Sequence, residues 1–130
     1  MLALGQYPMK WARLLDIAKA EVRATLRSLP AQLQAQARQV PVRYLPQPDR
    51  RPECVGLEPD TLGLFVGLPL AQTDWEPGEM TAQVFLFLEN LWAFAESDEG
   101  LYREEVRRTL LHELGHYLGL GETDLEDRQL

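Results

Sequence analysis

The chain of 130 residues contains one cysteine, Cys54, and only two histidines. A single cysteine excludes an internal disulfide framework and any zinc site built from two or more cysteines of the same chain. No apolar run approaches the ~18–20 residues that a membrane-spanning helix needs, so we expect no membrane partner. The N-terminal segment lacks a basic stretch ahead of an apolar one and lacks a small-residue cleavage site, which predicts a cytoplasmic protein.

Basic residues are also scarce, and the balance of charge is acidic. Lysine and arginine together number 13 against 20 aspartates and glutamates, which gives a formal net charge of −7. We therefore expect no nucleic-acid partner, because phosphate contacts require clustered lysine and arginine side chains. The length and the hydrophobic content of 45% are ordinary for a globular protein, so residues 1–130 are expected to form a single domain.

The apolar pattern predicts helices toward both ends of the chain and strands between them. Helices are expected at 8–29, at 31–38 and from about 101 to 118, one or two helical turns at 89–95, and strands at 40–44, 61–70 and 83–88. The run at 83–88 is apolar on both faces, which is typical of a central strand. This order predicts an α+β domain in which helices cover a small mixed sheet of about three to four strands.

The two histidines lie four residues apart in the motif His112-Glu113-Leu114-Gly115-His116, within the last long predicted helix. At about 100° per residue, positions 112 and 116 share one helix face, so both imidazoles can bind the same tetrahedral metal ion. Glu113 lies beside them, where a carboxylate can take a proton from a water that the metal has activated. The alternative is a helix with two incidental histidines and an exposed glutamate.

A catalytic zinc ion usually has three protein ligands and an open position for water, so a third ligand is needed. Only fourteen residues follow His116, which leaves little chain for a distant downstream ligand. The segment 112–122 matches the spacing HExxHxxGxxH, with Gly119 at the turn and Glu122 in the place of the third ligand. Asp124 is the competing candidate, and its other possible role is to cap a short final helix.

The motif and two upstream segments resemble the small bacterial zincin-like metallopeptidases, a family of small HExxH domains. The resemblance rests on LGLFVGLPL at 62–70, QVFLFLENL at 83–91 and EEVRRTLLHELGHYLGLGETDL at 104–125, within a region of roughly residues 53–125. It implies a minimal zincin fold, an active-site helix near the C-terminus and a peptidase-type metal site. Family members carry acidic residues just beyond the motif glycine, which is where Glu122 and Asp124 stand. The resemblance does not supply a substrate.

The motif and the resemblance together predict a zinc-dependent peptidase-like hydrolase. Zinc is expected to be bound by His112, His116 and Glu122, and Glu113 is expected to act as the general base. The expected partner is a peptide or protein substrate that lies extended along an edge strand at 62–68, because the glycines there allow a close approach of another backbone.

A non-catalytic module that binds metal or a protein partner on a zincin scaffold is the alternative function. The small size of the chain and the lack of an obvious oxyanion donor favour this alternative. The nearest basic pair, Arg107 and Arg108, is expected to form a solvated helix face with Glu104 and Glu105.

Overall fold

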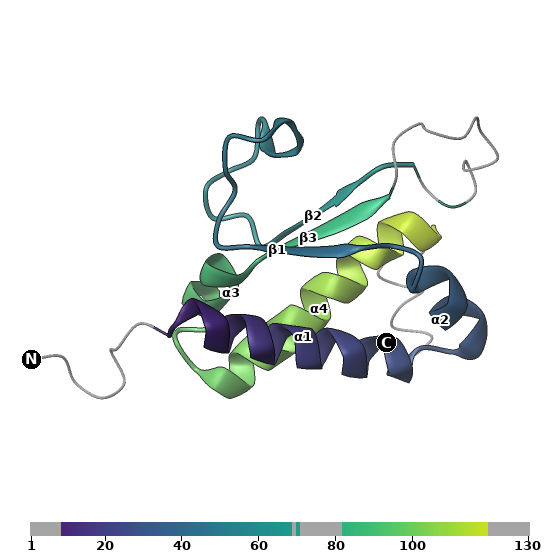
Figure 1. The fold of residues 1–130 in the computed structure, drawn as a ribbon, viewed down its shortest axis with the longest axis horizontal. Coiled ribbons are helices and arrows are strands. Elements are labelled where there is room, and N and C mark those ends of the chain that lie inside the picture. The colour runs from purple at the N-terminus through teal and green to yellow at the C-terminus, as the bar shows by residue number, and fades with distance from the viewer. Residues whose placement is uncertain (1–8, 69, 71–81, 120–130) are drawn as a thin grey trace, which may run out of the picture.

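The computed structural model describes residues 9–68, 70 and 82–119 (Figure 1). Its helices are α1 (Trp11–Ser28), α2 (Ala31–Ala37), α3 (Leu88–Phe94) and α4 (Glu99–Leu118), its strands are β1 (Val42–Leu45), β2 (Gly63–Val66) and β3 (Gln83–Phe87), and a 3-10 turn lies at Pro52–Cys54. The predicted order of elements is confirmed. None of the helices in these residues is long and apolar enough to cross a membrane.

The three strands form one mixed sheet in the order β1-β3-β2, so the predicted α+β class is confirmed. β1 runs parallel to β3, with Val42 opposite Val84, and β2 runs antiparallel to β3, with Phe65 opposite Val84. β3 is the central strand, as its apolar pattern predicts, and the side chains from Val84 to Phe87 are fully buried. Within the described residues β2 therefore forms one edge of the sheet.

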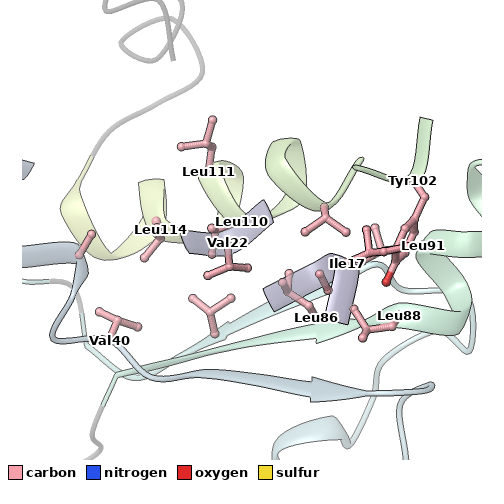
Figure 2. Close-up of a cluster of buried hydrophobic side chains, with 14 of the residues drawn as sticks. Ile17, Val22, Val40, Leu86, Leu88, Leu91, Tyr102, Leu110, Leu111 and Leu114 are labelled. Carbon is pink, nitrogen blue, oxygen red and sulfur yellow. The ribbon is translucent and has the colours of Figure 1, made fainter. Parts of the chain in front are cut away.

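The main hydrophobic core lies between one face of the sheet and the two long helices α1 and α4 (Figures 1 and 2). Figure 2 shows the side chains that fill this space, which include Ile17 and Val22 from α1, Leu86 from β3, and Leu110 and Leu114 from α4. Burial of such side chains contributes about 1.5–3 kcal/mol each before the cost of chain ordering. This core fixes which face of α4 is buried against the sheet and which face is left for the motif side chains.

A smaller cluster covers the opposite face of the sheet. Phe85 and Phe87 of β3 point to this side and pack with Cys54 from the 3-10 turn and with Leu57. Side chains alternate between the two faces along a strand, so β3 contributes side chains to both clusters. The buried Cys54 is therefore a packing residue of the second cluster.

Polar contacts at two points fix α4 and the chain before β2. The Tyr102 hydroxyl of α4 is fully buried and donates a hydrogen bond of 2.9 Å to the main-chain carbonyl of Leu14 in α1. Burial raises the pKa of the Tyr102 phenol, so the phenol stays neutral and remains a donor. The Asn90 side chain donates to the carbonyls of Pro59 at 2.7 Å and Thr61 at 2.9 Å, which anchors the entry to β2.

Candidate metal centre

The motif residues occupy the last turns of α4, a helix with defined caps at both ends. At its start the Asp98 carboxylate accepts a hydrogen bond of 2.9 Å from the Leu101 backbone N–H, so α4 begins two residues before the predicted start. At its end Gly119 adopts the left-handed conformation with φ 74°, and its N–H bonds to the carbonyl of Gly115. Glycine is favoured there because it has no Cβ, and the predicted end of the helix is confirmed.

The three motif side chains converge on one point beside α4. The possible ligand atoms of His112, Glu113 and His116 all lie within 4.8 Å of one another. The two imidazole rings are 5.1 Å apart between centroids and meet at 89°, and Nε2 of His116 lies 4.0 Å from Oε1 of Glu113. Both histidines are exposed, whereas the Glu113 residue is only 9% exposed. The helical spacing thus produces the predicted cluster.

The environment of Glu113 makes its carboxylate more basic than a carboxylate at the protein surface. Burial raises the pKa of this carboxyl group, and the nearby imidazoles of His112 and His116 partly oppose that rise. A hydrogen bond from the backbone N–H of Phe65 in β2 also lowers the pKa. A carboxylate with a raised pKa binds a proton more readily, and the contact with Phe65 ties the residue to the edge strand.

The donor set fits a zinc ion. Neutral imidazole nitrogens suit zinc and several other transition metals, and in a tetrahedral site with zinc–nitrogen bonds of 2.0–2.1 Å two such atoms are about 3.3 Å apart. The possible ligand atoms of the cluster lie within 4.8 Å of one another, so the two imidazoles would need to move closer together to bind one ion. The exposed imidazoles of His112 and His116 leave the approach open to an ion.

Some main-chain N–H and C=O groups of β2 next to the cluster point outward at the edge of the sheet and not toward β3. The Phe87 N–H donates to the Leu62 carbonyl at 3.0 Å, which fixes the alternation of hydrogen-bonded and non-bonded pairs along β2 and β3. In that alternation Gly63 and Phe65 belong to the non-bonded pairs. Their N–H and C=O groups therefore face the outer edge of β2, which has no neighbouring strand among the described residues, and this agrees with the contact between Phe65 and Glu113. The Phe65 ring also stacks near His116, with 6.4 Å between centroids.

Gly63 allows β2 to lie directly against α4. A Cβ atom at this position would be 2.5 Å from Cγ2 of Thr109 and 3.3 Å from both Cγ of Glu113 and the carbonyl oxygen of Phe85. Glycine in the strand at 62–68 is predicted to admit the backbone of a substrate. At Gly63 the space of the missing side chain is instead taken by the helix that carries the motif.

Gly63→Ala is expected to lower the free energy of unfolding by roughly 1–3 kcal/mol, because the new methyl group overlaps a packed helix. Chemical denaturation measures this effect. Thr109→Ser removes the Cγ2 atom of the closest contact, so in that background the cost of Gly63→Ala should shrink. Equal stability of Gly63→Ala and the parent protein would show that the helix does not approach this strand so closely.

A pocket of about 400 Å³ opens beside the metal site, along the part of α4 that precedes the motif. It is lined by Leu62, Gly63, Phe94, Glu105, Arg108, Thr109, His112 and Glu113. Arg108 and Glu105, two of the four residues of the predicted solvated helix face, form an ion pair of 2.8 Å, but both also line this pocket.

Sequence reasoning did not assign Phe94 or Thr109 to the site, whereas Leu62 falls in the predicted substrate strand at 62–68. Phe94 lies at the end of a short helix, and its large exposed fraction of 59% is visible only in the folded protein. The one sequence signal for Thr109 is its position three residues before His112, on the same face of the helix.

Both candidates for the third ligand, Glu122 and Asp124, lie outside the described residues, so each remains a prediction.

A helix that presents HExxH beneath the edge strand of a small mixed sheet defines a zincin-type site. The family model for zincin-like metallopeptidases matches residues 37–130, and the chain belongs to this family. The predicted resemblance is thereby confirmed. The match begins at the end of α2, so α1 lies outside it. A search of curated proteins gave no match.

Proposed function

We propose that the protein is a zinc-dependent peptidase that uses its HExxH cluster to hydrolyse peptide bonds. The convergence of the possible ligand atoms of His112, Glu113 and His116 within 4.8 Å, next to the free edge of β2, is the observation that carries the proposal. A metal site, a base and a strand edge in one place supply a means to activate water, a proton acceptor and a surface for an extended peptide.

The imidazoles of His112 and His116 hold the zinc ion, and Glu122 supplies the third ligand, with Asp124 as the alternative. When bound, zinc polarises the scissile carbonyl and lowers the pKa of the attacking water toward ~7. The two imidazoles must be neutral to bind, so zinc affinity falls at low pH. Their exposed position beside the pocket leaves room for the substrate carbonyl on the same side.

Glu113 moves the proton. Its carboxylate accepts the proton of the attacking water and then donates it to the leaving amine. Burial disfavours the charged form of this carboxyl, which makes proton uptake easier than at an exposed glutamate. The hydrogen bond from the Phe65 N–H restricts the orientation of the carboxylate during both transfers.

The free edge of β2 binds the substrate backbone. The outward N–H and C=O groups of Gly63 and the outward C=O group of Phe65 are arranged to pair with an extended peptide as an added strand, whereas the Phe65 N–H is bonded to Glu113. Because Phe65 also contacts the Glu113 carboxylate, a peptide on this edge lies within reach of the base. Pairing at a strand edge requires a substrate backbone that is extended and free to form hydrogen bonds, so it favours flexible peptides and chain termini over folded regions.

Cleavage of a peptide mixture by the zinc-loaded protein tests the proposal. We expect defined fragments, loss of cleavage after treatment with a chelator, and its return when zinc is added back. The His112→Ala protein, treated with the chelator and then with added zinc in the same way, is the control for contaminating peptidases. Zinc binding without cleavage of any peptide would favour the non-catalytic metal-binding module instead.

A further inference from the structure

One end of the pocket beside the metal site is formed by the ion pair of Arg108 and Glu105, whose two side chains differ strongly in exposure. Nη1 of Arg108 lies 2.8 Å from Oε1 of Glu105. The Arg108 side chain is 71% exposed, whereas the Glu105 side chain is 12% exposed. Glu105 therefore lies underneath and holds one end of the guanidinium, and Arg108 is the charged group that meets an incoming ligand.

Arg108 keeps donors available beyond this pair. A guanidinium carries five N–H groups in a planar fork, and Glu105 is the partner that the described part of the chain provides. An arginine already held by a carboxylate is ordered before binding, so it loses little side-chain entropy when a second carboxylate arrives. Arg108 is thus arranged to accept an anionic group in the two-pronged geometry that arginine favours.

Besides the ion pair and the motif residues His112 and Glu113, the pocket has apolar side chains in its lining. The lining includes Leu62 and Phe94, a residue that is 59% exposed, and Thr109, which lies between Arg108 and His112 in the sequence of α4. A large exposed ring at a pocket is a surface that an apolar side chain can cover. The pocket therefore combines one exposed cation with an apolar wall.

The position of Arg108 along α4 relates it to the reaction centre. Four residues separate Arg108 from His112, which corresponds to about 6 Å along the helix axis. Neighbouring residues of an extended peptide are 3.3–3.4 Å apart along the strand, so a group one or two residues from the scissile carbonyl reaches this distance. The distance between Arg108 and the metal site thus corresponds to a short stretch of substrate.

We propose that this pocket is a specificity subsite for a substrate carboxylate close to the scissile bond, bound by Arg108, with an apolar group resting on Phe94 and Leu62. The inference rests on the proposed peptidase function and adds the class of substrate. Two sources supply this chemistry, the free C-terminus of a peptide that ends in an apolar residue and an acidic side chain near the bond. A chain of net charge −7 repels anions at long range, so a local cation is needed to hold either one.

Peptide binding to the zinc-loaded Glu113→Gln protein tests the subsite without turnover. The probes are acetyl-Ala-Ala-Phe with a free carboxylate, the same peptide as its C-terminal amide, and amidated peptides that carry an internal Glu or Lys. We expect the free acid or the internal Glu peptide to bind at least ~10-fold more tightly than the neutral amide. Which of these two peptides gains affinity identifies the source of the carboxylate.

Arg108→Gln in the same background should abolish this difference, and Arg107→Gln, a neighbouring arginine outside the pocket, should preserve it. Equal binding of the neutral amide, the free acid and the internal Glu peptide, no measurable binding of any probe, or tighter binding of the Lys peptide through Glu105 would overturn the subsite. Discrimination that depends on Arg108 in a protein whose wild type cleaves no peptide would leave the subsite standing and remove the peptidase function.

Discussion

Glu113→Gln is expected to lower peptide turnover by at least ~10²-fold while zinc content stays at the wild-type level. Glutamine keeps the shape of the side chain and one acceptor oxygen, but its amide cannot take up the proton of the attacking water. Glu113 belongs to the cluster, but it is largely buried and its carboxylate accepts a hydrogen bond from the Phe65 N–H, so we expect its replacement to remove a base and not a ligand. Zinc content and peptide cleavage are measured side by side.

Glu104→Gln is the matched control, because Glu104 lies on the exposed side of the same helix and does not line the pocket. This variant should cleave at the wild-type rate. Wild-type turnover in Glu113→Gln would show that the base is another group or that the activity belongs to a contaminant. Loss of zinc from Glu113→Gln would instead assign Glu113 to the metal.

His112→Ala or His116→Ala is expected to reduce zinc binding from about one ion per chain to none detectable at neutral pH. These are the only histidines of the chain, and removal of a direct ligand should exceed the ~10–100-fold loss of affinity that follows removal of an outer-shell partner. Competitive zinc titration and elemental analysis after dialysis against trace zinc measure the effect.

The metal-free forms of both histidine variants should unfold within about 1 kcal/mol of the metal-free parent, because both residues are exposed. This comparison separates loss of a ligand from loss of the fold. Undiminished zinc binding in either variant would contradict the assignment of that histidine. A large drop in stability without zinc would mean that the residue is part of the packing.

Local patterns account for what the sequence predicts well. The four-residue spacing of His112 and His116 fixes their common face on any α-helix, and the all-apolar run at 83–88 indicates a strand buried on both sides. The left-handed end at Gly119 follows from the conformational freedom of glycine. These features depend on neighbours in the chain and not on the tertiary fold.

Features that depend on long-range pairing are not visible in the sequence. The contact of Gly63 with Thr109 requires the register of β2 on β3 and the path of α4 across the sheet. Likewise, the sequence predicts a helix around Leu14 but not that its main-chain carbonyl accepts a hydrogen bond from the buried Tyr102 hydroxyl. The position of Arg108 in the pocket is not visible in the sequence either, because Phe94 and Leu62, which line the same pocket, are distant from it along the chain.

Diffraction at the zinc absorption edge from crystals of the zinc-loaded protein tests the central claim most directly. We predict one zinc ion per chain, about 2.0–2.1 Å from one imidazole nitrogen of each of His112 and His116, with Glu113 outside the coordination sphere. The carboxylate of Glu122 is the predicted third ligand, and Asp124 in its place would reassign that one role. A zinc ion bound elsewhere on the chain, or one coordinated by Glu113, would contradict the proposed catalytic site.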